Sequence, residues 1–372
     1  MNNKRNLFIA TVMFAGLTGA AFADDVDIQL GAHAFLDYEN ASIAGMDVVD
    51  GTNLRLFRID VKGSVGDYRF ASNVDFAGDD VKVKDLYAEF GDNVRVRIGN
   101  FKVMNGLEQQ SSLYATTFME AGSVSKLNGI SRSLGVGVYT SAGPFNLSAG
   151  VFGPDANVLD DTDMYSMSAR AAWHTQPMGE DSVLHFAGSV RYRDTNDSGL
   201  LSYNQRPFAP SAPKTISASG IGESDVFYGL EAAFLNGGFS AQAEYGHTEI
   251  SCPSSVCTED PSSDAYYVDV SYMWGGHRNF SGSLFKRDTV DTPVSQGGMG
   301  AFALSGRYDY ADLSDTQLSG GEQETFVLGG TWYLDRYVRF MVNLTHSEFE
   351  DSPVYGNDDA QSVLFRAQLE LY

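Results

Sequence analysis

Short segments in which apolar and polar residues alternate run along this chain, and none of them is a long apolar run. In the C-terminal segment 363–372 the apolar side chains share one parity, while Arg366, Gln368 and Glu370 share the other. Successive side chains of a β-strand point to opposite faces, so this segment predicts a strand with one apolar and one polar face. Segments of about ten residues with this alternation, separated by turn residues, are typical of outer-membrane β-barrels. The polar faces would then line a lumen.

The same alternation predicts sixteen strands. We place them, in chain order, at 26–38, 53–62, 67–76, 83–90, 94–101, 133–140, 145–152, 163–173, 183–193, 225–234, 239–247, 265–274, 301–311, 325–333, 338–346 and 361–372. Closure of a bacterial single-chain barrel requires an even number of strands. We therefore predict an all-β fold, a 16-stranded antiparallel transmembrane β-barrel of the bacterial porin type.

The connections between these strands alternate in length. Short ones such as 63–66 and 91–93 carry the glycine, asparagine or aspartate that tight hairpins need. The long ones are 39–52, 102–132, 194–224, 248–264 and 347–360. Outer-membrane barrels have short periplasmic turns and longer outside loops, so both termini are expected in the periplasm. The long connection 275–300 falls on the periplasmic side and does not follow this rule.

The N-terminus has the pattern of a secretion signal. Lys4 and Arg5 precede an apolar stretch at 7–17, and Ala21-Phe22-Ala23 forms a small-residue cleavage site. A membrane anchor is the alternative, but the apolar stretch is too short to span a bilayer. We expect residues 1–23 to be removed near Ala23 and residues 24–372 to form the barrel. No later run of 18 apolar residues exists, which excludes transmembrane helices.

The formal charge of the chain is −23, with 48 acidic against 25 basic residues. Such an excess of negative charge argues against nucleic acid as a partner. Many of the acids fall in predicted loops, as at 155–163 and 350–359, so the total charge does not decide which ions the lumen prefers.

Cys252 and Cys257 are the only cysteines, and both lie in the Pro- and Ser-rich segment 251–263. A secreted chain passes through an oxidising compartment, so we expect a disulfide that closes a small loop. A metal site would need more ligands than His247 can supply. We predict no metal and no cofactor.

Basic residues inside the strands test the barrel, because Lys or Arg on the lipid face near the bilayer centre costs about 2–4 kcal/mol. Their side chains fall on the polar face of each strand. Arg58, for example, lies between the apolar Phe57 and Ile59, whose side chains point to the opposite face. The basic residues predicted to line the lumen are Arg58, Lys62, Arg69, Arg95, Arg97, Arg170, Arg191, Arg193, Arg307 and Arg339. Arg55 and Lys84 break the parity, and we place them near the outer rim, where the cost is about 0–1 kcal/mol. Acids also face the lumen, so mutual pairing and attraction of anions both stay open.

The connection 102–132 is long enough to have a function of its own. In a barrel of this width, an inward fold of this loop would narrow the channel. Its candidates for contacting a solute are Lys102, Lys126 and Arg132, which Glu108 and Glu120 oppose. An exposed outside loop is the alternative.

Short motifs spread over nearly all of the mature chain resemble the phosphate-selective porins O and P. They are Arg55-Leu56-Phe57-Arg58, Asn73-Val74-Asp75-Phe76, Lys84-Asp85-Leu86-Tyr87, Ile98-Gly99-Asn100-Phe101-Lys102, Gly106-Leu107-Glu108, Ser111-Ser112, Phe118-Met119-Glu120, Tyr192-Arg193, Arg206-Pro207, Gly300-Ala301-Phe302-Ala303-Leu304, Arg307-Tyr308-Asp309-Tyr310-Ala311-Asp312-Leu313, Gly320-Gly321 and Trp332-Tyr333. The resemblance implies a 16-stranded trimeric channel with an inward-folded third loop, of which some members conduct phosphate. In the family an arginine typically follows the glutamate matched by Glu120, and here that position is Ala121.

These observations predict an outer-membrane porin, a passive diffusion channel for small hydrophilic solutes, with anion or phosphate selectivity as the narrower hypothesis. Its expected partners are outer-membrane lipid, lipopolysaccharide, small anions as solutes and two further copies in a homotrimer. One alternative is a structural or adhesive barrel with a closed lumen. Another is an outer-membrane hydrolase, but the six histidines are scattered and none has a motif that ties it to a serine. We therefore predict no enzymatic activity.

Overall fold

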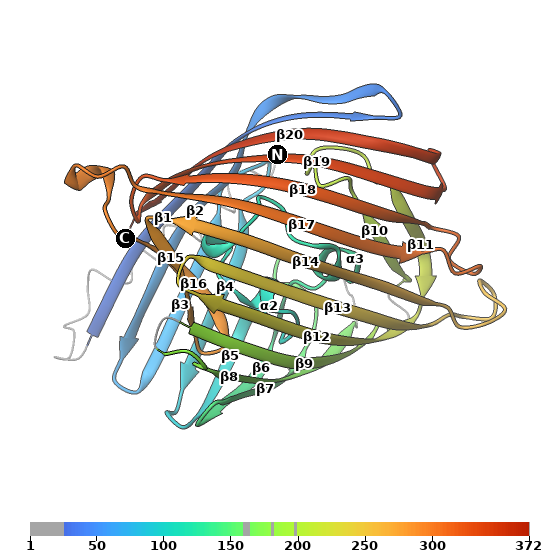
Figure 1. Cartoon of the computed structure of the whole chain (residues 1–372). Helices are drawn as coiled ribbons and strands as arrows, with labels where there is room; N and C mark the ends of the chain where they lie inside the picture. The colour runs from blue at the N-terminus through green and yellow to red at the C-terminus, as the bar shows by residue number, and fades with distance from the viewer. Residues whose placement is uncertain (1–25, 159–163, 180–181, 197–198, 372) are drawn as a thin grey trace, which may run out of the picture.

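The computed structural model describes residues 26–158, 164–179, 182–196 and 199–371, and these form one closed antiparallel barrel (Figure 1). Among these residues sixteen strands make the wall, and β1 pairs with β20 to close it. In order around the wall they are β1 (Val26–Ile43), β2 (Met46–Val65), β3 (Tyr68–Asp75), β4 (Lys82–Phe90), β5 (Val94–Lys102), β6 (Arg132–Ala142), β7 (Phe145–Phe152), β8 (Tyr165–Thr175), β9 (Ser182–Asp194), β12 (Ser224–Asn236), β13 (Phe239–Ser251), β14 (Ser262–Trp274), β17 (Ala301–Leu313), β18 (Gly321–Tyr333), β19 (Val338–Ser352) and β20 (Gly356–Leu371). The predicted fold class is confirmed. The signal sequence expected at 1–23 lies outside the described residues.

The two faces of the wall differ as the alternation requires. On β20, Phe365 and Leu369 are exposed on the outside, whereas Arg366 and Gln368 are buried inside the barrel. The apolar outer face suits hydrocarbon, while the inner face can satisfy its polar groups in the lumen. In the described part of the chain, no helix is long and apolar enough to cross a membrane.

Two predicted loops are wrong, because 39–52 and 347–360 are mostly strand. β1 and β2 continue pairing as far as Ile43 and Met46 and turn through Ala44 and Gly45, which both have positive φ (52° and 70°). Such a two-residue turn matches the twist of a hairpin. β19 and β20 likewise extend to Ser352 and Gly356. In these extensions buried apolar side chains such as Ile43, Phe349 and Ala360 face inward and polar ones such as Glu348 are exposed, so the alternation is reversed while the backbone ladder continues.

The two basic residues that broke the parity rule both lie at β-bulges. The β1–β2 pairing joins Phe35 to Leu56 and Leu36 to Leu54, so it skips Arg55. The β3–β4 pairing joins Asn73 to Asp85 and Val74 to Val83, so it skips Lys84. An extra residue in one strand changes which face the following side chains take. Both cations line a cavity inside the barrel, so our placement at the rim does not describe their environment.

Two short hairpins lie outside the wall's strand order. β10 (Leu201–Gln205) and β11 (Ile216–Gly222) form one in the connection 194–224, at the long-loop end. The backbone of this hairpin bonds to the β17–β18 loop, where Ser217 N donates to Gly320 O. β15 (Gly276–Ser281) and β16 (Leu284–Val290) form the other, in the connection 275–300 at the short-turn end (Figure 1).

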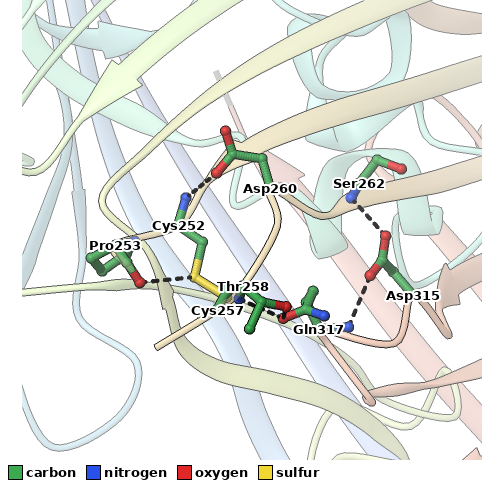
Figure 2. Close-up of a disulfide and its surroundings, with 8 residues drawn as sticks. All are labelled: Cys252, Pro253, Cys257, Thr258, Asp260, Ser262, Asp315 and Gln317. Carbon is green, nitrogen blue, oxygen red and sulfur yellow. Dashed lines mark hydrogen bonds between the residues drawn. A yellow bond between two sulfur atoms is a disulfide. The ribbon is translucent and has the colours of Figure 1, made fainter. Parts of the chain in front are cut away.

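The structure joins Cys252 and Cys257 in a disulfide that closes the tip of the β13–β14 loop (Figure 2). The closed loop is tied to the neighbouring β17–β18 loop, because Thr258 N donates to Gln317 Oε1 at 2.9 Å. Ser262 N donates to Asp315 Oδ2 at 3.3 Å. The disulfide therefore belongs to a pair of joined loops at the outer rim.

Candidate pore constriction

The segment 103–131 folds into the barrel and reaches the opposite wall. It contains α2 (Leu107–Gln110), the 3-10 helix η1 (Leu113–Ala115) and α3 (Ser123–Leu127). Figure 1 shows α2 and α3 inside the barrel. It leaves the wall between β5 and β6, and its backbone bonds to β17 and β19. Ser123 N donates to Asp309 Oδ2 at 2.9 Å, and Met119 N donates to Asn343 Oδ1 at 2.8 Å. We call residues 103–131 the crossing loop.

Arg307 of β17 is the main polar attachment of the crossing loop. Its Nε and Nη2 donate to the carboxylate of Asp269 on β14 at 2.6 and 2.7 Å, and Nη2 also donates to Glu108 Oε1 at 2.8 Å. Nη1 donates to the carbonyl of Glu120 at 3.2 Å, and the guanidinium lies 4.8 Å from the centre of the Phe118 ring. Charge-assisted bonds in a buried site are stronger than those in water. The buried Arg307 side chain therefore contacts the crossing loop at three residues, Glu108, Phe118 and Glu120.

The crossing loop fills the lumen on one side only. Its apolar residues Met104, Val124 and Leu127 join Phe227 of β12 and Tyr267 of β14 in a continuous buried cluster. On the other side, next to β2–β6, two cavities of about 510 and 570 Å³ remain. We call the cavity of about 510 Å³, which includes Lys84 and Ser131 toward the long-loop end, the upper cavity. The lower cavity is the one of about 570 Å³, which includes Lys62 and Ser141 toward the short-turn end.

The two cavities share five lining residues. They are Arg58 of β2, Lys102 of β5, Arg132 of β6, and Ser111 and Leu113 of the crossing loop. We call these five residues the junction. These residues lie where the two cavities adjoin, so the junction is the candidate constriction.

Two of the three junction cations are paired with carboxylates. Arg58 Nε lies 2.9 Å from Asp75 Oδ2, and Arg132 makes two bonds of 2.9 Å to Asp85. Lys102 differs: its Nζ donates to the carbonyl of Ser111 at 2.6 Å, and within the described residues it forms no ion pair. Among the described residues, Lys102 is therefore the one basic residue of the junction without a carboxylate partner.

Cations outnumber acids along both cavities. Seven basic and three acidic residues line the upper cavity, and eight basic and two acidic residues line the lower one. The upper set is Arg55, Arg58, Lys84, Lys102, Lys126, Arg132 and Arg366 with Asp75, Glu108 and Glu120, and the lower set is Arg58, Lys62, Arg95, Arg97, Lys102, Arg132, Arg170 and Lys286 with Asp60 and Asp85. The path is thus basic although the whole chain is acidic.

The structure divides the predicted lumen residues into two groups. Arg58, Lys62, Arg95, Arg97 and Arg170 line the lower cavity, as the parity of their strands implies. The others line neither of the two cavities. Arg69 shares Glu89 with Arg95 and Arg97, Arg191 and Arg193 share Asp225, Arg307 holds the crossing loop, and Arg339 donates to Gln368 and to the carbonyl of Thr116. These arginines stabilise the wall and the loop.

The five candidate residues predicted on the connection 102–132 also differ in their contacts. Lys102, Lys126 and Arg132 border the cavities, and Glu120 pairs with Lys126 at 2.9 Å and with Arg55 at 3.2 Å. Glu108 receives Gly122 N at 2.7 Å in addition to Arg307, so it holds the loop's own shape.

Sequence reasoning missed four cations beside the path. Arg55 and Lys84 were hidden by bulges that parity does not reveal. Lys286 lies on the β15–β16 hairpin, in a connection that carried no strand assignment. Arg366 was visible on the polar face of the last strand, where it makes bonds of 2.8 and 2.7 Å to Asp37, and the strand pattern could have identified it.

Glu120 holds a negative charge between cations in the upper cavity. Burial alone would raise its pKa, but the charges of Lys126, Arg55 and Arg366 outweigh burial and lower the pKa to about 2. An unfolded glutamate titrates near 4.3. The ion pairs therefore add stability at pH above about 4.3, and this stability is lost as the pH falls toward about 2.

Replacing Glu120 by glutamine should lower the stability of the detergent-solubilised protein at pH 7 by about 2 kcal/mol, after a discount for the partly exposed Lys126 and Arg55. The difference between wild type and E120Q should shrink as the pH falls from about 5 to about 3. Urea unfolding at several pH values measures this. The control is Glu259→Gln, on the exposed outer loop, which should match wild type throughout. A constant gap between wild type and E120Q at all pH values would contradict the assigned charge.

A sequence profile of the family described as phosphate-selective porin O and P matches residues 26–372. An uncharacterised protein of Caulobacter vibrioides is 26% identical over 327 residues, which cover 83% of this chain and 65% of that protein. Porin O of Pseudomonas aeruginosa is 25% identical over 311 residues, which cover 74% of this chain and 70% of that protein. The chain thus spans about two-thirds of the length of these relatives.

Solved structures with the same architecture include OmpT of Vibrio cholerae, with a TM-score of 0.60 at 10% identity and coverage of 94% of this chain and 98% of that one. OprB of Pseudomonas putida has a TM-score of 0.59 at 11% identity, with 93% and 94% covered. The outer membrane channel DcaP of Acinetobacter baumannii has a TM-score of 0.57 at 11% identity, with 94% and 99% covered. At such identities the likeness shows the fold alone. Because the profile match spans the whole barrel, the chain belongs to the phosphate-selective porin O and P family and is a β-barrel of the bacterial outer membrane.

Proposed function

We propose that the protein is a passive outer-membrane porin that prefers small anions. One observation carries this proposal: basic residues outnumber acids along both cavities and at the junction between them. Rings of Arg or Lys are an established way to select anions, because a low-dielectric wall strengthens their field. The acidic residues that give the chain its charge of −23 do not line this path in comparable number.

The solute class that fits is a small inorganic anion such as phosphate. Arg58 and Arg132 present guanidinium groups, which bind tetrahedral oxyanions through paired N–H donors, and Lys102 adds a point charge. Arg58 and Arg132 already donate to Asp75 and Asp85, so a passing anion would bond only to the N–H donors that these pairs leave free. This favours transient contact and rapid release over tight binding, as conduction requires. The family's name supports phosphate as the narrower proposal.

We infer further that the protein works as a homotrimer. A trimer form of OmpT of Vibrio cholerae is among the structures that share the fold, with a TM-score of 0.57. Each barrel has its own complete path, so the proposed conduction does not need a residue from another copy.

The reversal potential of the reconstituted protein in a planar bilayer tests the proposal. Under a tenfold KCl gradient it should indicate chloride permeating in excess of potassium, and added phosphate should reduce the chloride current by competing for the junction. High salt should weaken the preference through screening. A cation preference would overturn the anion proposal, and indifference to phosphate would overturn its narrower form. Absence of any conductance would support a closed structural barrel.

A further inference from the structure

The β15–β16 hairpin enters the lumen from the short-turn end, where the sequence offered no explanation for a long connection. It turns through Gly282 and Ser283, which both have positive φ (60° and 61°), as a two-residue hairpin turn requires. Its tip lies against the wall formed by β7 and β8. Asn146 Nδ2 donates to Ser283 Oγ at 2.8 Å, and Arg170 Nη2 donates to Ser283 O at 3.2 Å.

The hairpin also packs beneath the crossing loop. Phe285 is buried to 2% exposure in a cluster with Leu107 and Ala115 of the loop. Arg278 lies 4.0 Å from the centre of the Phe285 ring and donates to Thr117 Oγ1 at 2.7 Å. Two segments that enter the barrel from opposite ends thus meet inside it.

Ser111 connects this contact to the junction. Its hydroxyl accepts the backbone N–H of Phe285 at 3.1 Å, and its carbonyl accepts Lys102 Nζ at 2.6 Å. Ser111 ends α2, with its own N–H bonded to Leu107 O, so its position depends on both the helix and the hairpin.

The place of the Lys102 ammonium group is therefore set by a single neighbour. A lysine side chain has four flexible carbons and is fixed only by what its ammonium group bonds to. Among the described residues the Ser111 carbonyl is the one hydrogen-bond acceptor for Nζ, and no carboxylate forms an ion pair with it. Moving Ser111 would move the charge that distinguishes the junction.

We propose that the β15–β16 hairpin is a positioning element for anion selection, acting through Ser111 on Lys102. The proposal rests on the anion preference inferred above. It gives the long periplasmic connection a role: it holds the crossing loop from below, so that the junction keeps its charge in the path. Phe285 and Ser111 are positioning residues, and Lys102 is the residue that meets the solute.

The test measures the chloride-to-potassium permeability ratio of Phe285→Ala, Ser111→Ala and Lys102→Gln, singly and with each positioning change added to K102Q. F285A and S111A should each lower the ratio about threefold, the effect of losing about one hydrogen bond or its equivalent in packing. Neither should lower it further in the K102Q background, because both act through Lys102. The matched control is Met299→Ala, a large exposed side chain of the same connection, which should behave as wild type. Heat-modifiable migration on gels checks that each barrel is folded.

The outcomes separate this inference from the proposed function. A wild-type ratio that favours potassium refutes the anion preference itself. An anion-selective wild type whose ratio falls in K102Q but not in folded F285A or S111A overturns the positioning role alone. An equal drop from F285A with and without K102Q also overturns it, since the hairpin would then act independently of the lysine. If F285A does not fold, S111A, which removes only a hydroxyl group, decides the question.

Discussion

Replacing Lys102 by glutamate is expected to abolish the anion preference of the channel and to turn it toward cations. The substitution puts a negative charge at the junction, where Asp75 and Asp85 already neutralise Arg58 and Arg132. With a dielectric constant of about 40 and a separation of about 6 Å, removing one unit charge changes the ion's energy by about 1.4 kcal/mol. That corresponds to about a tenfold change in the permeability of each ion, in opposite directions for chloride and potassium, and reversing the charge should about double the effect in free energy.

Reversal potentials of wild type, K102Q and K102E in one salt gradient measure this series, which should be graded in that order. Lys214→Glu is the control, because it makes the same charge change on an exposed residue of the 194–224 connection. If K214E shifted the reversal potential as far as K102E, the selectivity would belong to the overall charge of the mouth and not to the junction. An unchanged ratio in K102E would remove Lys102 from the path.

Truncation of Arg307 to alanine is expected to release the crossing loop and to raise single-channel conductance several-fold, with added current noise. The variant leaves Glu108 and Asp269 buried without their cation and also removes the bond to the Glu120 carbonyl. Removing one partner of a buried ion pair costs about 3–5 kcal/mol. The β-barrel should survive, because its backbone ladder does not depend on this side chain.

Conductance and hydrogen exchange of residues 103–131 measure the release. The matched control is Arg69→Ala, since Glu89 keeps Arg95 and Arg97 as partners and the loop is not touched. Wild-type conductance together with wild-type protection of the loop in R307A would show that the apolar cluster around Phe227 and Tyr267 holds the loop without help from the ion pairs.

The sequence predicted the wall well because lipid acts on every second residue of every strand. Arg58 and Arg307 could be placed inside from parity alone, since an outward arginine at mid-membrane is costly. The same argument failed beyond the membrane, where apolar side chains of the β1–β2 and β19–β20 extensions such as Ile43 and Phe349 pack inside the barrel and polar ones are exposed, so the alternation is reversed. It also failed at Arg55 and Lys84, because a bulge depends on the pairing of two strands and leaves no mark in one of them.

The division of the basic residues into wall supports and path residues could not be predicted either. Arg97 and Arg307 look alike in sequence, but their roles depend on which carboxylates the strand register and the crossing loop bring near them. The β15–β16 hairpin shows the same limit. Its residues alternate weakly, and the contacts that hold it come from Asn146, Arg170 and Ser111, far away along the chain.

The basic residues of the junction all come from one side of it, and this would influence the orientation of a passing solute. Arg58, Lys102 and Arg132 all come from the barrel wall, whereas the facing side is made by the neutral Ser111 and Leu113. Because the Lys102 ammonium group reaches the Ser111 carbonyl, the polar groups extend from the β2–β6 wall to Ser111 and leave Leu113 as the apolar side. A solute with an anionic head and a nonpolar tail would enter oriented, its head sliding along the β2–β6 arc and its tail against Leu113.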